Sequence, residues 1–216
     1  MNAYDFISAN KVIVIVRKMY GDDLLNLSKA LYAGGVRLME VTFDQQDPLR
    51  AEKTAAAIAM LGECHGDKMM FGAGTVLTIE QVDAACKAGA KYIISPNFKA
   101  EVVEHTKKRG LVSIPGCMTP TEIIDAHDCG ADFVKLFPAT TLGFKYIKDI
   151  LAPISHVKLV ATGGVNEENF GEYLDLGFAG AGISGRLTDR KLIAEGNWEE
   201  LTRRAQVFSD IAKQYR

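Results

Sequence analysis

Residues 112–138 read VSIPGCMTPTEIIDAHDCGADFVKLFP and contain one complete strand–helix–strand unit. The stretch opens and closes with short apolar runs typical of buried strands, Val112–Ile114 and Phe133–Phe137. Between them, TPTE at 119–122 is a capping box with proline at the first helical position, and Gly130 follows the expected end of the helix. This order indicates two parallel strands joined by a helical crossover.

The same unit recurs along the rest of the chain. Strands are expected at Val12–Val16, Arg37–Thr42, Met69–Ala73, Tyr92–Ser95, Val112–Ile114, Phe133–Phe137, Lys158–Ala161 and Gly180–Ile183. Helices are expected after them, at Asp22–Ala33, Pro48–Leu61, Ile79–Ala88, Ala100–Arg109, Pro120–Cys129, Phe144–Leu151, Glu167–Leu176 and Trp198–Gln214. Because strands and helices alternate, we expect a parallel sheet.

The length of the chain suits one closed barrel. Eight strand–helix units in about 200 residues is the size of a compact (β/α)8 barrel. We therefore predict an α/β fold, a (β/α)8 TIM barrel forming a single domain over residues 1–216, with an extra N-terminal helix at Ala3–Ser8. Nearly continuous apolar strands such as Val12–Val16 fit, because parallel sheets are buried on both faces. An open doubly wound sheet is the alternative and would need a reversal of strand order.

The composition excludes several classes of protein. The chain is 48% apolar and 24% charged with a net charge of −2, which is ordinary for a globular protein. It has no run of five or more basic residues, so no nucleic-acid partner is expected. It has neither a long apolar segment nor an apolar leader, so no membrane partner and no secretion are expected. The four cysteines lack zinc-type spacing, which favours reduced thiols in a cytoplasmic protein.

Lys135 is the most unusual residue of the sequence, because it lies inside the apolar run Phe133–Phe137. Burying an ammonium ion is costly unless the ion is paired or loses its proton. A lysine in such a strand is therefore either paired structurally or kept as an amine with a lowered pKa. A neutral amine is the form that attacks a carbonyl to make a Schiff base.

Further polar residues lie at the C-terminal ends of the expected strands, where barrels of this type carry their chemistry. Arg17 ends the first strand, and Glu40 and Thr42 share one face of the second. If these side chains point inward, an arginine, a glutamate and Lys135 meet near the barrel mouth. A buried Glu40–Lys135 salt bridge is the structural alternative, although such pairs add little stability over apolar packing.

Two glycine-rich turns follow the last two strands. Gly163 and Gly164 come after the seventh strand, and Gly182 and Ser184 belong to the eighth. Loops at these positions often bind phosphate through backbone N–H groups, and Ser184 could add a hydroxyl. The alternative is that the glycines only permit positive φ angles.

Neither a metal nor another cofactor is expected. The carboxylates near the mouth, Glu40 and Asp44, are only a pair, and Cys117 has no histidine at a strand end to activate it. The histidines fall in expected helices or loops away from the strand ends, at His65, His105, His127 and His156.

Taken together, the strand-end motifs resemble those of the class I aldolases that cleave 2-keto-3-deoxy-6-phosphogluconate (KDPG) and 4-hydroxy-2-oxoglutarate (KHG). The resemblance runs from about Asn10 to Arg216 and rests on these segments: Glu40–Thr42, Gly72–Val76, Ile94–Asn97, Ile114–Gly116, Met118–Glu122, Val134–Pro138 and Thr162–Asn166. It implies a homotrimeric (β/α)8 barrel, a Schiff-base mechanism and no metal.

The resemblance also assigns roles to individual residues. Lys135 matches the Schiff-base lysine and Glu40 the general acid/base. Thr75 matches a residue that contacts the pyruvyl portion, and Pro96 and Phe137 match residues that wall the pocket. The distal hydroxyl and phosphate are expected at Thr162, Gly163, Gly164 and Ser184, and Thr42 is also expected to bind substrate. Asp44 departs from the family pattern, because many members have arginine there. We expect Arg17 to bind the carboxylate instead, a task that suits a guanidinium.

The expected reaction is cleavage of KDPG, KHG or both to pyruvate plus glyceraldehyde 3-phosphate or glyoxylate. The phosphate turn favours a phosphorylated keto acid as the small-molecule partner. Three alternatives stay open: the galactonate epimer of KDPG as substrate, a phosphate-binding isomerase or epimerase barrel, and a catalytically silent barrel that serves as a binding module.

Overall fold

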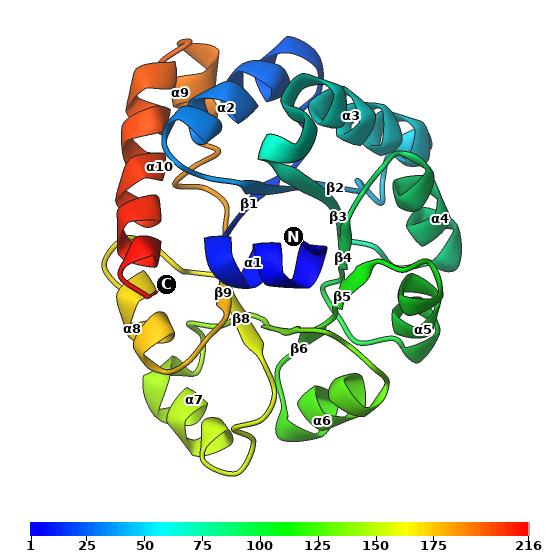
Figure 1. The fold of residues 1–216 in the computed structure, drawn as a ribbon, viewed down its shortest axis with the longest axis vertical. Coiled ribbons are helices and arrows are strands. Elements are labelled where there is room, and N and C mark those ends of the chain that lie inside the picture. Colours follow the sequence, from blue (N-terminus) through cyan, green and yellow to red (C-terminus); the bar gives the residue numbers. More distant parts are fainter. Residues whose placement is uncertain (216) are drawn as a thin grey trace.

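The computed structural model describes residues 1–215, which form a ring of parallel strands surrounded by helices (Figure 1). The strands are β1 (Val12–Val16), β2 (Leu38–Thr42), β3 (Met70–Gly74), β4 (Tyr92–Ile94), β5 (Val112–Ile114), β6 (Gly116–Cys117), β7 (Val134–Leu136), β8 (Leu159–Thr162) and β9 (Gly180–Ile183). The helices are α1 (Ala3–Asn10), α2 (Gly21–Ala33), α3 (Arg50–His65), α4 (Ile79–Lys87), α5 (Ala100–Lys108), α6 (Pro120–Asp128), α7 (Gly143–Leu151), α8 (Phe170–Asp175), α9 (Arg190–Ala194) and α10 (Trp198–Lys213), with a 3-10 turn, η1 (Gly66–Lys68).

The barrel closes through the segment that contains β5 and β6. These strands stand at the two edges of the sheet, whose order is β5-β4-β3-β2-β1-β9-β8-β7-β6, yet only Pro115 separates them in the chain. The N–H of Phe133 donates to the carbonyl of Ser113 (3.3 Å), and the N–H of Lys135 donates to that of Pro115 (2.8 Å). The two short strands therefore act as one interrupted strand between β4 and β7. The predicted TIM barrel is confirmed, and the open doubly wound sheet is excluded.

Helix α1 covers the N-terminal end of the barrel, where Figure 1 shows it crossing the centre of the ring. Its Ile7 is buried and packs with inward-facing residues such as Ile13 and Leu38. The ring of Tyr4 stacks on that of Phe133, with centroids 4.7 Å apart. The expected extra helix is thus confirmed, and it seals the end of the barrel opposite to the C-terminal strand ends.

Side chains of successive strand residues alternate between two apolar clusters, as the pleat requires. One cluster fills the barrel, and the other lies between the strands and the helices. Ile13 and Leu38 belong to the inner cluster, and Ile15 and Glu40 are their inward neighbours two residues on. Phe133 is also inward, which puts Lys135 on the same side. The alternation thus delivers two charged side chains to the barrel interior.

Helix α8 begins later than expected because a polar side chain binds backbone groups ahead of it. Helix α8 begins at Phe170 rather than Glu167, since Asn166 Oδ1 accepts from the N–H groups of Glu168 (2.9 Å) and Asn169 (3.2 Å) and holds a turn there. Helix α9 was not expected; its first turn is capped by Asp189. Among residues 1–215, no helix has the length and apolar character to cross a membrane.

Candidate active site

Lys135 lies in the middle of β7 with its side chain inside the barrel and is 5% exposed. Its Nζ atom is 4.7 Å from the centroid of the Phe137 ring. Burial lowers the pKa of Lys135; Glu40 works against this change, and Arg17 adds to it. The neutral amine, which is the form that attacks a carbonyl, is therefore easier to reach here than at the protein surface.

Glu40 lies on β2 and is fully buried at 1% exposure. Burial raises the pKa of its carboxyl group, and the positive charges of Lys135 and Arg17 oppose that rise. Its Oε2 atom finds no hydrogen-bond partner among the described residues. The neighbouring Gly74 provides the space, because a Cβ atom there would lie 2.7 Å from Glu40 Oε1. A buried polar atom without a partner needs an explanation, and a catalytic role is one.

Glu40 and Lys135 influence each other without direct contact. Among the described residues, the Lys135 amine and the Glu40 carboxylate do not approach within 4.0 Å of each other. The salt bridge considered as the structural alternative is thus not formed. Two buried ionisable groups without direct pairing are a candidate for chemistry.

Arg17 follows β1 and completes the expected trio of charges. Its Nη1 atom donates to the hydroxyl of Ser184 (2.9 Å), which joins the ends of β1 and β9. The positive charge of Arg17 lowers the pKa values of both Glu40 and Lys135, so it influences the groups inside the barrel. The arginine, the glutamate and the lysine are therefore brought together, as the sequence predicts.

A cavity of about 370 Å³ opens at this end of the barrel. It is lined by Ile15, Arg17, Phe137, Thr162, Gly163, Gly164, Val165, Asn166, Ser184, Gly185 and Arg186. The predicted distal-group residues of β8 and β9 thus share one cavity with Arg17 and Phe137. Gly163 and Gly164 have φ angles of 96° and 80°, which glycine adopts without strain.

Five predicted residues do not line this cavity: Lys135 and Glu40 inside the barrel, and Thr42, Thr75 and Pro96 at or after strand ends. Thr42 is buried at the end of β2, and Pro96 comes shortly after β4. Thr75, directly after β3, has a φ of 55°, a left-handed conformation that is strained for a β-branched residue. Gln45 Nε2 donates to the carbonyl of Thr75 (2.8 Å). Strained residues of this kind gather at functional sites.

Asp44 forms an ion pair with Lys18, whose Nζ atom lies 3.1 Å from Asp44 Oδ2. Lys18 directly follows Arg17, and it too has a left-handed φ, 52°. The carboxylate that departs from the family pattern is therefore neutralised locally.

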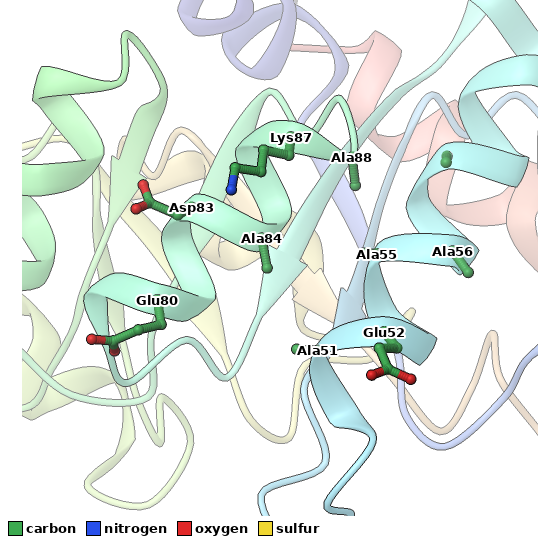
Figure 2. A pocket seen from close by; sticks show the side chains of 10 residues that line it. Ala51, Glu52, Ala55, Ala56, Glu80, Asp83, Ala84, Lys87 and Ala88 are labelled. Carbon is green, nitrogen blue, oxygen red and sulfur yellow. The ribbon is translucent and has the colours of Figure 1, made fainter.

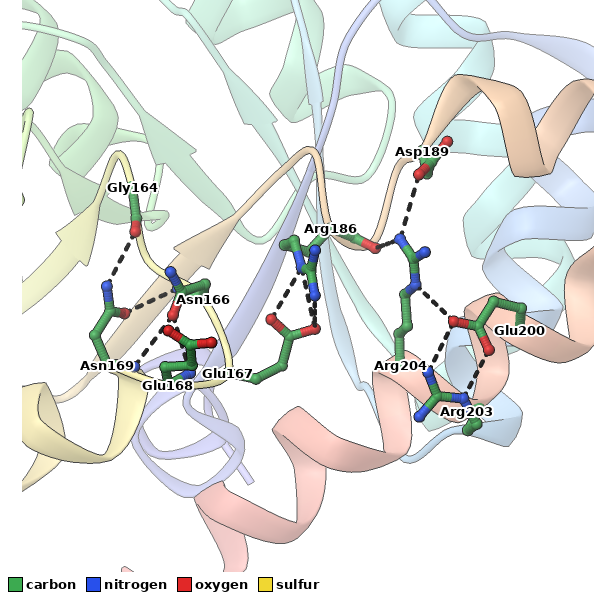
Figure 3. A network of polar contacts seen from close by, with 10 residues as sticks. All are labelled: Gly164, Asn166, Glu167, Glu168, Asn169, Arg186, Asp189, Glu200, Arg203 and Arg204. Carbon is green, nitrogen blue, oxygen red and sulfur yellow. Dashed lines mark hydrogen bonds and ion pairs between the residues drawn. The ribbon is translucent and has the colours of Figure 1, made fainter.

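Arg186 was missed by the sequence analysis, although it lines the cavity. Its guanidinium meets the Glu167 carboxylate at two points, with Nε 2.9 Å from Oε2 and Nη2 3.0 Å from Oε1 (Figure 3). The only sequence signal was its position two residues after Ser184, in a polar stretch with the composition of an ordinary surface loop.

Other cavities and reactive side chains are less suited to catalysis. A larger cavity of about 670 Å³ lies between α3 and α4, and Figure 2 shows its alanine lining with Glu52, Glu80, Asp83 and Lys87 around it. It is on the outside of the barrel, away from the strand ends. Burial raises the pKa of the Cys117 thiol to about 12, which disfavours a thiolate. Within residues 1–215, no group of three or more acidic, histidine or cysteine side chains is arranged to hold a metal.

Comparisons with known proteins agree with this geometry. The family model of KDPG and KHG aldolase matches residues 5–204. The chain is 36% identical to a 2-dehydro-3-deoxy-6-phosphogalactonate aldolase of Escherichia coli, covering 82% of this chain and 83% of the relative. It is 41% identical to a 2-dehydro-3-deoxy-phosphogluconate aldolase of Treponema pallidum, covering 76% and 75%. A solved KDPG aldolase from Legionella pneumophila, with pyruvate captured as a covalent carbinolamine, superposes with a TM-score of 0.84 at 29% identity, covering 96% and 98%.

Proposed function

The chain belongs to the KDPG and KHG aldolase family and is therefore a carbon–carbon lyase, and we propose that Lys135 forms its Schiff base. One observation carries this proposal: Lys135 is a buried lysine on a barrel strand, outside any ion pair of the described residues, and burial lowers its pKa. A carbinolamine with pyruvate in a solved relative supports amine chemistry in this fold.

In the proposed reaction, neutral Lys135 attacks the C2 ketone of a 4-hydroxy-2-keto acid. Loss of water gives a protonated imine, which accepts the electrons of the C3–C4 bond when a base removes the proton of the C4 hydroxyl. The aldehyde leaves, the remaining enamine is protonated at C3, and hydrolysis of the imine releases pyruvate. Glu40 is the proposed base and proton carrier, directly or through one water, a role worth about 10²–10⁴-fold in rate.

The remaining site residues are proposed to hold the substrate. Arg17 binds the keto-acid carboxylate through the guanidinium N–H groups that Ser184 leaves free. Thr75 contacts the pyruvyl portion, Pro96 and Phe137 wall the pocket, and Thr42 also binds substrate. The distal hydroxyl and phosphate are bound by Thr162, Gly163, Gly164 and Ser184. If Arg17→Met leaves the KM of the keto acid unchanged, the role of Arg17 is wrong.

A phosphorylated substrate is favoured by the cavity between the glycine-rich loops. KDPG would give pyruvate and glyceraldehyde 3-phosphate, and KHG would give pyruvate and glyoxylate. The galactonate epimer is the alternative substrate, because the Escherichia coli enzyme named for it is 36% identical. Comparison of kcat/KM for the three acids decides among them.

We also propose a homotrimer in the cytoplasm. The trimer is implied by the family, and sedimentation analysis would test it through a mass three times that of the chain. The four free cysteines support a reducing compartment.

The decisive experiment is borohydride trapping with pyruvate followed by peptide mass spectrometry. We expect a reduced pyruvyl adduct on Lys135 and none in Lys135→Ala, whereas the exposed Lys158→Ala serves as a matched control that retains the adduct. An adduct on another lysine would move the nucleophile. The absence of an adduct in folded protein would favour the alternatives of an isomerase or of a catalytically silent barrel. An isomerase would release no pyruvate from the keto acid.

A further inference from the structure

The cavity at the barrel mouth is lined by two arginines that have different interaction partners. Arg17 is exposed and donates to the hydroxyl of Ser184, and its charge acts on Lys135. Arg186 comes from the loop after β9 and is 56% exposed, so its guanidinium lies at the outer edge. The cavity is thus lined by two guanidinium groups, of which that of Arg186 is paired with Glu167, and two such groups suit a substrate with two separated anionic groups.

The Arg186–Glu167 pair links the two loops that border this cavity. Glu167 belongs to the loop after β8, which contains Gly163 and Gly164, and Arg186 to the loop after β9, which contains Ser184. Exposed ion pairs of this kind contribute little to stability. A guanidinium fork that binds a carboxylate at two points also matches the oxygens of a phosphate.

The backbone at Arg186 is fixed independently of its side chain. Arg204 Nη1 donates to the carbonyl of Arg186 (3.2 Å) and contacts Asp189 Oδ2 (3.3 Å), while its Nε donates to Glu200 (2.9 Å) (Figure 3). Arg204 itself is only 19% exposed. The Arg186 side chain can therefore exchange partners while the loop that carries it stays in place.

We propose that Arg186 determines specificity for the distal phosphate of the substrate, and that Glu167 holds its guanidinium until the phosphate replaces the carboxylate. This inference rests on the proposed aldolase function and adds to it a residue that selects phosphorylated over unphosphorylated keto acids. Glu167 then has a cost for catalysis, because it competes with substrate for the same cation.

The test compares KDPG with 2-keto-3-deoxygluconate, which has the same carbon chain but a hydroxyl in place of the phosphate. Arg186→Ala should lower kcat/KM for KDPG by about tenfold to hundredfold, mainly through KM, since one charged hydrogen-bonding group is lost. The loss for the unphosphorylated acid should be at least about fivefold smaller. Glu167→Gln should raise kcat/KM for KDPG, and this gain should vanish in the Glu167→Gln/Arg186→Ala double variant.

The matched control is Arg109→Ala, which removes an exposed arginine from its pair with Asp83 on the outside of the barrel, where Arg109 Nε and Nη2 both lie 2.7 Å from Asp83 Oδ1. A merely structural pair would make Arg186→Ala and Glu167→Gln lower kcat/KM in the same direction and equally for both acids, which would overturn the proposal. Failure of the aldolase function is separate, since it would appear as absence of the Lys135 pyruvyl adduct in the unmodified protein.

Discussion

At the scale of single residues, Lys135 and Glu40 depend on the same physical cause. Burial is the largest influence on both pKa values, and it lowers that of the amine while raising that of the carboxyl group. Both changes favour the uncharged forms. A neutral amine attacks the ketone, and a protonated carboxyl group can supply the proton needed to expel water from the carbinolamine. One buried environment thus prepares the nucleophile and the acid together.

The charge of Arg17 should be visible in the pH dependence of imine formation. Because Arg17 lowers the pKa of Lys135, Arg17→Met should raise that pKa and shift the rise of the rate to higher pH. Glu40 raises the pKa of Lys135, so Glu40→Gln should shift it to lower pH. Rapid-mixing measurements at saturating pyruvate over a pH series would show the two opposite shifts, and shifts in the same direction would contradict the electrostatic account.

Gly74 should matter because of the space it leaves. A Cβ atom there would lie 2.7 Å from both Cδ and Oε1 of Glu40, so Gly74→Ala should displace the carboxyl group and lower kcat at least about tenfold. The matched control is Gly62→Ala in α3, where an added Cβ atom would meet nothing within 4 Å. The control should keep full activity. Equal kcat values for the two variants in steady-state kinetics would refute the role of Gly74.

At the scale of elements, sequence patterns predicted most of the barrel because local signals and tertiary structure agree. The strands at Val12–Val16, Val112–Ile114 and Gly180–Ile183 have the predicted bounds. The break at Pro115 was not predicted, since it depends on pairing with β4 on one side and β7 on the other. Helix α9 was missed because its five residues are too few for a helical period to emerge.

The capping box of α6 yields a prediction at this scale. Glu122 Oε2 accepts from the N–H groups of Met118 (2.8 Å) and Thr119 (2.9 Å), and these bonds lower the pKa of Glu122. Glu122→Gln should reduce the free energy of unfolding at neutral pH by about 0.5–1 kcal/mol, near the low end for caps because the side chain is exposed.

The sign of the pH effect at Glu122 is fixed by its lowered pKa. The stabilisation is present above the unfolded value of 4.5 and is lost as pH falls through the lower folded pKa. Urea unfolding at neutral and acidic pH should therefore show the difference between wild type and Glu122→Gln shrinking in acid. A difference that stays constant with pH would mean that the charge of Glu122 plays no part.

At the scale of the whole molecule, the barrel explains which part of the candidate site the sequence could predict. Lys135 and Glu40 were predictable because a charged residue inside an apolar strand stands out from its neighbours. The alternation of side chains along the strand then indicates which face of the sheet the charged side chain lies on. Arg186 and its pairing with Glu167 were not predictable, because an arginine in a polar loop violates no pattern. The Lys18–Asp44 pair likewise depends on which loops the closed barrel brings together.

The active-site charges should weaken the fold that holds them. Replacing buried charged groups by well-packed apolar side chains of similar volume is often neutral or stabilises a protein by about 1–4 kcal/mol. Lys135→Met/Glu40→Leu should therefore raise the free energy of unfolding by up to about 4 kcal/mol while abolishing cleavage. The exposed pair Lys145→Met/Asp149→Asn is the control and should change stability far less. The raised pKa of Glu40 means that its ionised form costs stability above that pKa, and that no cost remains below the unfolded value of 4.5. The double variant should therefore be more stable than Lys135→Met alone at neutral pH but not below the unfolded value of 4.5. Urea unfolding at neutral and at acidic pH would measure this difference. A difference in the free energy of unfolding that persists in acid would contradict an origin in the ionised Glu40 carboxylate.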